Sequence, residues 1–140
     1  MTGPAAPGPT LTLTLRPGSL AICRLPAAAP VPDWAWQGTF HSITRTPDEL
    51  SVICDHAAAT AAPAAEGLRV DGPWRVFEVQ GPFAFEVTGV VAALSRPLAE
   101  AGIGIFVLST FDTDWILVKA TSADSAAEAW RAAGHTVAAG

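Results

Sequence analysis

Basic residues are scarce in this sequence. Lys and Arg together number 8 of the 140 residues, against 13 Asp and Glu, and the formal net charge is −5. A protein that binds the phosphates of a nucleic acid needs a cluster of Lys and Arg side chains on its surface. The composition leaves no material for such a cluster, and it therefore argues against a nucleic-acid partner.

Long apolar runs are also absent, although half of the residues are hydrophobic. A membrane-spanning helix needs about 20 consecutive apolar residues, and the best stretches, residues 87–94 and 103–108, are only as long as core elements. The opening MTGPAAPGPT has neither the basic nor the apolar region of a secretory signal. We expect a cytoplasmic globular protein that makes no membrane contact, with residues 1–9 as a flexible tail.

Cysteine and histidine are too few and too dispersed to predict a metal site. Cys23 and Cys54 lie in the apolar strings LAICRL and LSVICD, and no CxxC or Cys/His spacing accompanies them. Two buried free thiols are one interpretation, and a disulfide between neighbouring strands is the other. His41, His56 and His135 are far apart in the sequence. We therefore predict no metal, no cofactor and no catalytic residue.

Alternation of apolar and polar residues predicts strands, and apolar residues at helical spacing predict helices. The expected strands are 11–15, 20–25, 38–44, 50–54, 68–70, 74–79, 103–109, 113–118 and 135–137. The expected helices run from Asp55 to about Gly67, over 87–101 with a bend at Pro97, and from Ser122 or Asp124 to 133. Asp33 can begin a single helical turn, and Asp71-Gly72-Pro73 is typical of a turn.

An internal repeat organises these elements. Placing Thr44 over Thr110 aligns ITRTPDELSV with STFDTDWILV and superposes Asp48 on Asp114. Upstream, residues 20–26 overlie 76–82, so the first copy lacks about ten residues where the second carries its first helix. We predict an α+β fold of two βαββαβ units, with antiparallel sheets and helices on one face. The units are 10–72, whose first helix is reduced to PVPDWAW, and 73–140.

The second copy carries a family resemblance. GPFAF at 81–85, TGV at 88–90 and above all LAEAGIGIFVLSTFDTDWILV at 98–118 resemble ACT domains. The similarity is greatest to small bacterial tandem-ACT proteins related to the CASTOR arginine sensors and to the regulatory region of aspartate kinases, and it extends over residues 10–137. The resemblance implies tandem ferredoxin-like units, a homodimer, and a small ligand, usually an amino acid, bound at an interface between ACT units.

The resemblance also implies where the ligand binds, namely the loop into the first helix of the second unit and its second strand with the following turn. The implied ligand-binding residues are Phe85, Thr88, Gly89, Val90, Gly104, Ile105, Ser109, Thr110, Asp112, Thr113 and Asp114. Their chemistry agrees, because a helix N-terminus favours an α-carboxylate. Glycine lets a ligand approach the backbone, and a carboxylate can hold an ammonium group through charge-assisted hydrogen bonds.

Each of these residues also has a purely structural interpretation. Gly89 can serve helix–sheet packing, Gly104 can relieve crowding, and Thr88 can cap the helix. Neighbouring strand residues face opposite ways, so we favour Asp114 for the ligand and Asp112 for an ordinary hairpin turn. In the first copy, the missing helix removes the anion-binding terminus, which favours a structural or partner-binding role for that unit.

The tryptophans are expected in the core or at interfaces. Trp34 and Trp36 would cover the sheet where the first helix is missing, and Trp130 lies on the small-residue face of the last helix. The function that these observations favour is a non-catalytic regulatory protein that binds an amino acid. A ligand-free interaction or dimerisation module is the alternative. An enzyme of the aspartate kinase type is disfavoured, because the sequence has no phosphate-binding loop and no room for a kinase domain.

Overall fold

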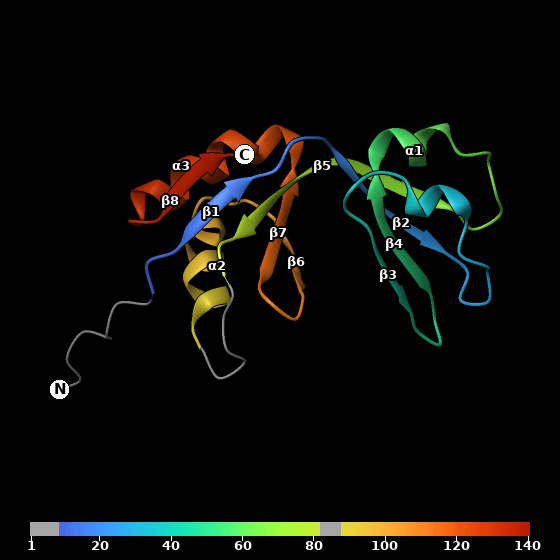
Figure 1. The fold of residues 1–140 in the computed structure, drawn as a ribbon, viewed down its shortest axis with the longest axis horizontal. Coiled ribbons are helices and arrows are strands. Elements are labelled where there is room, and N and C mark those ends of the chain that lie inside the picture. The colour runs from blue at the N-terminus through green and yellow to red at the C-terminus, as the bar shows by residue number, and fades with distance from the viewer. Residues whose placement is uncertain (1–8, 82–87) are drawn as a thin grey trace. The chain divides into compact units, whose positions relative to one another are not determined.

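The computed structural model describes residues 9–81 and 88–140, and the chain folds into two compact units. The N-terminal unit is Gly18–Arg75, and the C-terminal unit combines the residues that end at Pro17 with Val76–Gly140. Strand β5 (Arg69–Val79) supplies both units. Its first part pairs with β2, and its last part pairs with β1 (Figure 1).

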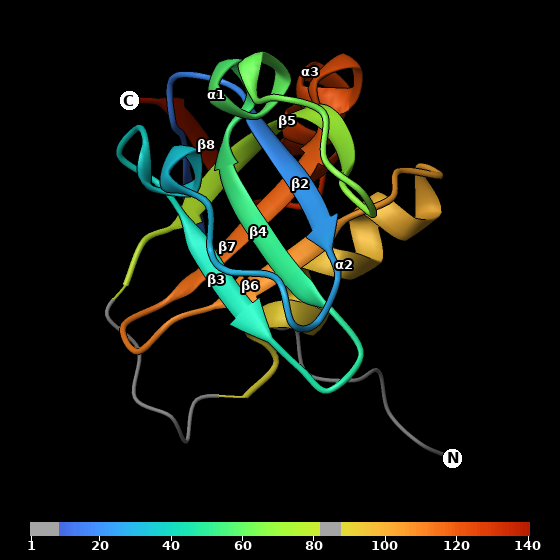
Figure 2. The same cartoon turned by 90° about the vertical axis from the view of Figure 1, so that its right-hand side faces the viewer.

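The N-terminal unit is an antiparallel sheet in the order β3-β4-β2-β5. Its own strands are β2 (Leu20–Leu25), β4 (Leu50–Asp55) and β3 (Ser42–Arg45), which lie side by side in Figure 2. The alternation of the sequence predicted β2 with its observed ends and β4 to within a residue. The helix expected from Asp55 to about Gly67 is shorter, and α1 ends at Ala61 (His56–Ala61).

The predicted loss of the first helix is confirmed. In its place stands η1 (Asp33–Trp36), a single 3₁₀ turn that contacts β4 and α1. The tight 3₁₀ turn brings Ala35 to the core with no exposed surface. Trp34 packs partly against the core, but Trp36 is 54% exposed, so the expectation that both tryptophans cover the sheet is wrong for Trp36. The core itself consists of Ala21, Cys23, Leu25, Ala35, Leu50, Val52, Cys54 and Ala59.

The C-terminal unit has the strand order β8-β1-β5-β7-β6. Strands β6 (Phe106–Ser109) and β7 (Asp114–Lys119) form a hairpin, and β1 (Thr12–Leu15) lies between β5 and β8 (Thr136–Ala139). The β1–β8 pair is parallel, whereas the sequence predicted antiparallel sheets. The reason is that β1 is an extra strand, added to a βαββαβ unit between its first and last strands.

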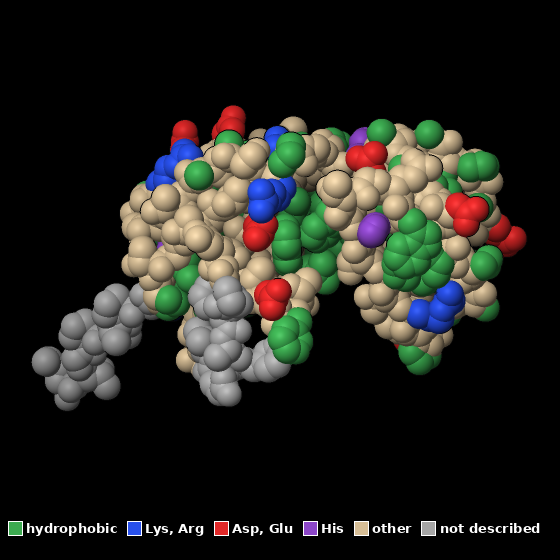
Figure 3. Space-filling view, in the orientation of Figure 1, with side chains coloured by type: hydrophobic (Ala, Val, Ile, Leu, Met, Phe, Trp, Pro, Cys, Tyr) green, Lys and Arg blue, Asp and Glu red, His purple; other side chains and the backbone are tan. Residues whose placement is uncertain are grey.

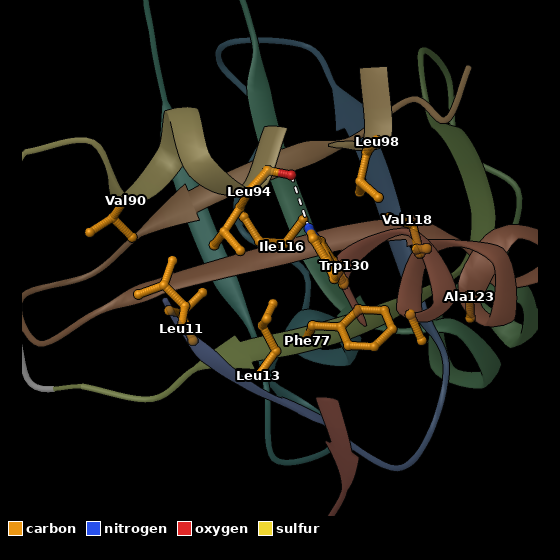
Figure 4. Packing of buried hydrophobic residues seen from close by; sticks show 13 residues of the cluster. Leu11, Leu13, Phe77, Val90, Leu94, Leu98, Ile116, Val118, Ala123 and Trp130 are labelled. Carbon is orange, nitrogen blue, oxygen red and sulfur yellow. Dashed lines mark hydrogen bonds between the residues drawn. The ribbon is translucent and has the colours of Figure 1, made fainter. Parts of the chain in front are cut away.

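Two helices cover one face of this sheet. These are α2 (Val90–Glu100), which contains Pro97, and α3 (Ala123–Ala132), which follows the short turn η2 (Ala120–Ser122). Figure 4 shows Trp130 between them, with its Nε1–H donating to the Leu94 carbonyl at 2.9 Å. The indole meets Phe77 edge to face at a centroid distance of 4.8 Å. The buried cluster comprises Leu11, Leu13, Phe77, Val79, Val90, Leu94, Leu98, Ile116, Val118, Ala123, Ala126, Ala127 and Trp130.

The two units are not the contiguous segments 10–72 and 73–140 that the sequence predicted. Because β1 pairs with β5 and β8, residues 10–17 fold with the C-terminal unit. The turn expected at Asp71-Gly72-Pro73 is also absent, since β5 runs through it and the Gly72–Pro73 peptide is cis. The register of β5 against β2 shifts at this point, between Leu20 and Ile22, and such an irregularity accommodates a proline and a glycine within a strand.

The two hairpins repeat each other with a different alignment from the predicted one. The Thr46 amide donates to the Glu49 carbonyl at 2.9 Å, and the Thr110 amide donates to the Thr113 carbonyl at 2.8 Å. Thr46 is therefore equivalent to Thr110, and Asp48 is equivalent to Asp112. The superposition of Asp48 on Asp114 is wrong by two residues, because it matched aspartates where the turns share a threonine.

Within the described residues, no helix is both long enough and apolar enough to cross a membrane. The face drawn in Figure 3 carries its Lys and Arg side chains singly, without a basic patch.

Candidate functional site

The turn between β6 and β7 is anchored to the end of β5. The Thr110 hydroxyl donates to the Thr113 carbonyl at 3.0 Å, which closes the turn. Thr113 is 9% exposed, and its hydroxyl donates to the Val79 carbonyl at 2.5 Å. A bond of this length to a strand carbonyl holds the turn in a defined position.

Gly81 allows the turn to come this close. A Cβ at this position would lie 2.9 Å from the Asp112 carbonyl oxygen and 3.1 Å from the Thr113 Cβ. Beside this contact is a hollow of about 200 Å³, lined by Glu78, Gly81, Asp112 and Thr113. The end of β5 and the β6–β7 turn thus form the two walls of a small acidic depression.

The charge of the hollow comes from two carboxylates. The Glu78 carboxylate accepts hydrogen bonds from the Arg16 guanidinium at 2.9 and 2.6 Å, and both side chains retain solvent contact. Asp112 is exposed at the turn. A hollow with two acidic walls and one arginine is suited to the positively charged group of a small molecule.

Asp114 lies on the other side of the strand. Its Oδ1 accepts a hydrogen bond of 2.6 Å from the Ser109 hydroxyl, and these two residues close the β6–β7 ladder. Asp114 shares its strand face with Ile116 and Val118, the face that α2 and α3 cover. The structure thus brings Asp112 and Thr113 to the hollow, and it places the Ser109–Asp114 pair at the edge of the helix-covered face.

The start of α2 contributes backbone rather than side-chain groups. Gly89 is the N-cap residue, with φ of 82° and no side-chain cap bond, so Thr88 does not cap the helix. The positive φ accounts for the glycine at this position. Thr88 is exposed, while Val90 is 6% exposed and belongs to the core. Gly89 therefore provides no side-chain acceptor for the first-turn N–H groups of α2.

The remaining predicted residues are more peripheral. Gly104 is exposed, and a Cβ there would meet nothing within 4 Å, so the glycine does not relieve crowding. It precedes β6 rather than lying in a strand, and Ile105 is half-buried against the core. Phe85 lies outside the described residues.

The candidate site is thus one end of the C-terminal unit. In both Figure 1 and Figure 2, the N-terminal end of α2 and the β6–β7 turn lie at the same end of this unit. The two elements are joined by the segment from Gly81 to Thr88, most of which is not described. Glu78 alternates with the core residues Phe77 and Val79, so the acidic hollow opens on the sheet face away from the helices and is suited to a cation, whereas the N-terminus of α2 favours an anion on the helix-covered side.

Sequence reasoning missed Glu78 and Arg16 as members of this site. Glu78 is the polar residue between two apolar residues of an alternating strand, a pattern that predicts only a side chain facing solvent. Arg16 precedes it by 62 residues, and only the pairing of β1 with β5 brings the two together. Gly81 was recognised within the ACT-like string, but its contact with the turn has no signal in the sequence. Among residues 9–81 and 88–140, no group of three His, Cys, Asp or Glu side chains can hold a metal ion.

Comparisons with known families agree with this architecture. An ACT-domain family model matches residues 69–131, and a second model, of an N-terminal domain, matches residues 18–59. Residues 69–131 of the chain belong to the ACT-domain family. The predicted resemblance and the tandem ACT-like α+β fold are thereby confirmed.

Individual relatives place the chain within the family. It is 42% identical to protein Atu0741 from Agrobacterium tumefaciens, whose crystal structure superposes with a TM-score of 0.83 over 94% of this chain and 95% of that one. It is 34% identical over 86 residues to cytosolic arginine sensor for mTORC1 subunit 1 from Bos taurus, a match that covers 57% of this chain. The chain spans only 26% of the length of that sensor.

The fold also recurs in enzyme regulation. The regulatory subunit of aspartate kinase from Thermus flavus superposes with a TM-score of 0.60 over 91% of this chain and 99% of that one, at 14% identity. At this identity the match concerns the fold alone.

Proposed function

We propose that this protein is a non-catalytic regulatory module that binds an amino acid at the candidate site of its C-terminal unit. The observation that carries the proposal is the acidic hollow formed by Glu78, Gly81, Asp112 and Thr113 at the same end of the unit as the N-terminus of α2. The hollow would hold the ammonium group or a basic side chain of the ligand through charge-assisted hydrogen bonds. The arginine-sensor relative, which carries this ligand class in its name, supports the choice of ligand.

Binding would regulate through linkage. A ligand that prefers one arrangement of ACT units shifts the population toward that arrangement, and the shift is limited by its difference in affinity. The Arg16–Glu78 ion pair supports such a mechanism, because an incoming cation competes with Arg16 for the same carboxylate.

A thermal-shift and calorimetric screen of the twenty amino acids tests the proposal. A ligand at about 1,000 times its dissociation constant stabilises the folded state by about 4.1 kcal/mol, so a millimolar ligand of micromolar affinity raises the melting temperature measurably. We expect stabilisation by one or a few amino acids, with basic ones favoured by the acidic hollow. If none stabilises the protein at millimolar concentration, the proposal is wrong.

The Asp112→Asn variant locates the site. It removes one negative charge from the hollow and keeps the size of the side chain, so we expect the dissociation constant to rise about 10-fold, the loss of roughly 1.5 kcal/mol from a charged hydrogen bond. Asp48→Asn is the matched control, since Asp48 occupies the equivalent turn of the N-terminal unit. If Asp112→Asn and Asp48→Asn change the affinity for the amino acid equally, the ligand does not bind at this hollow.

A ligand-free interaction module is the second candidate. The observation in its favour is the exposure of two large aromatic side chains, Trp36 at 54% and Phe111 at 78%, since exposed aromatics are typical of contact surfaces. Both candidate functions include a homodimer and a cytoplasmic location, and the name of the arginine sensor supports the location.

Light scattering after size-exclusion chromatography tests the dimer. A monomer that still binds an amino acid would favour an amino-acid sensor that does not self-associate.

A further inference from the structure

Two cysteines meet in the core of the N-terminal unit. In the β2–β4 ladder, Cys23 pairs with Val52 and Cys54 pairs with Ala21, so the cysteines are diagonal neighbours on adjacent strands. Both belong to the same buried cluster, which places them on the same face of the sheet. Cys23 is 1% exposed and Cys54 is fully buried, and both are free thiols.

The two thiols are hydrogen-bonded in a defined direction. The Cys54 Sγ–H donates to the Asp55 carbonyl at 3.6 Å, so the proton of this thiol is directed to the backbone. The hydrogen bond from Cys23 favours a thiolate at Cys54 and lowers the pKa of that thiol, although burial opposes the effect. The same hydrogen bond, together with burial, raises the pKa of Cys23. One sulfur is therefore the better nucleophile, and the other is held against it as a proton donor.

We propose that Cys23 and Cys54 are an oxidation site at which a peroxide closes a reversible disulfide between β2 and β4. The Cys54 thiolate attacks one oxygen of hydrogen peroxide, the O–O bond breaks, and the product is a sulfenic acid. The departing hydroxide takes up the thiol proton and leaves as water. The Cys23 sulfur then attacks the Cys54 sulfur, the S–S bond forms, and the sulfenic oxygen leaves as a second water with the Cys23 proton. Two thiols and one peroxide give one disulfide and two waters.

The position of the pair makes this site slow but reversible. Hydrogen peroxide is a small molecule, and only Asp55 separates Cys54 from α1, a helix of six residues without a side-chain cap. A short helix of this kind opens locally. Diagonal strand neighbours have Cα atoms about 7–8 Å apart, whereas disulfides prefer 4.4–6.8 Å. The two cysteines are offset by two residues along the ladder, so closure requires one strand to shift along the other, and strained disulfides are those that reductants reopen readily.

Mass spectrometry of the full chain tests the proposal. Reduced native protein is treated with hydrogen peroxide, quenched and then labelled with N-ethylmaleimide in denaturant. We expect molecules that are two hydrogens lighter and take up no maleimide, and two labels per chain again after dithiothreitol. Trypsin should release a linked pair of peptides that end at Arg24 and Arg69. Linkage between two chains, or sulfinic acid on one cysteine beside a free partner, would overturn the proposal.

Single replacements separate the two roles. In Cys23→Ala, the sulfenic acid on Cys54 lacks its resolving partner and should become trappable by dimedone, whereas Cys54→Ala should leave Cys23 largely unoxidised. Circular dichroism verifies that each variant folds. If either variant is unfolded, a comparison of wild-type protein in buffer and in urea decides, since a disulfide that forms only in urea contradicts a native site. None of these outcomes depends on whether the protein binds an amino acid.

Discussion

At the scale of single residues, two glycines of the ACT-like segment have opposite surroundings. A Cβ on Gly81 would lie 2.9 Å from the Asp112 carbonyl, while a Cβ on Gly104 would meet open space. We expect Gly81→Ala to destabilise the protein by about 1–3 kcal/mol, the usual range for overpacking against atoms that cannot move aside.

Gly104→Ala is the control for that prediction. Its backbone needs no positive φ, so the substitution should be neutral or stabilising by up to about 1 kcal/mol through the unfolded chain. Urea denaturation followed by tryptophan fluorescence measures both variants. Equal midpoints for Gly81→Ala and wild type would mean that the turn does not pack against β5 as described.

His135 supports a second residue-scale prediction. It is 8% exposed, and its Nδ1 accepts a hydrogen bond of 3.1 Å from the buried Leu11 amide. His135→Leu would leave that amide without its acceptor, at a cost of about 1–3 kcal/mol. His135→Asn offers an oxygen in a similar place and should recover part of the loss.

The limits of sequence reasoning at this scale are physical. The residue types at the site were predictable because glycine, threonine and aspartate have narrow conformational and chemical uses. Which aspartate faces the hollow was not predictable, since it depends on where β7 begins. With Asp114 as the first strand residue, Asp112 stays in the turn and reaches the hollow.

At the scale of elements, α2 continues through a proline. Pro97 lies in the interior of Val90–Glu100, where it provides no N–H to the Ala93 carbonyl. Pro97→Ala restores that donor, and we expect a gain of about 1–3 kcal/mol, within the difference between proline and alanine inside helices. Thermal unfolding measures the gain. A melting temperature unchanged or lowered would show that the helix depends on the constraint of the ring.

Element prediction succeeded where local signals agree with tertiary contacts. Alternation in LAICRL and LSVICD matches strands whose one face is buried, and the replacement of the first helix by PVPDWAW followed from the repeat. It failed at Asp71-Gly72-Pro73, which has every local mark of a turn. There the strand is retained because Gly72 fits between Leu20 and His56, where a Cβ would lie 2.9–3.0 Å from their atoms.

At the scale of the whole molecule, the C-terminal unit is assembled from two separate stretches of chain. Its inner strand β1, which lies between β8 and β5, is more than 60 residues upstream of β5, with Leu13 paired to Val79. We therefore expect a fragment of residues 73–140 to be unfolded or molten alone, because the side chains of Leu11 and Leu13 are missing from its core.

A synthetic peptide of residues 9–17 should restore structure to that fragment. Complementation is measured in two ways. Near-ultraviolet circular dichroism should recover, and the amide NMR signals of the fragment should shift until the added peptide saturates it. The control is the same peptide with Leu13→Lys, which places a charge at a position with no exposed surface. A fragment that folds without the peptide would contradict the assignment of β1 to the core of this unit.

The parallel β1–β8 pair has a consequence for synthesis on the ribosome. Thr12 pairs with Thr136, so β1 must wait until more than 120 further residues have been made before it can pair with β8. The intervening Gly18–Arg75 segment has all its own strands available much earlier and can fold as a unit while translation continues. Closure of the C-terminal unit is then a late, long-range event of the slow kind, and the candidate site takes its final form only after β8 has been made.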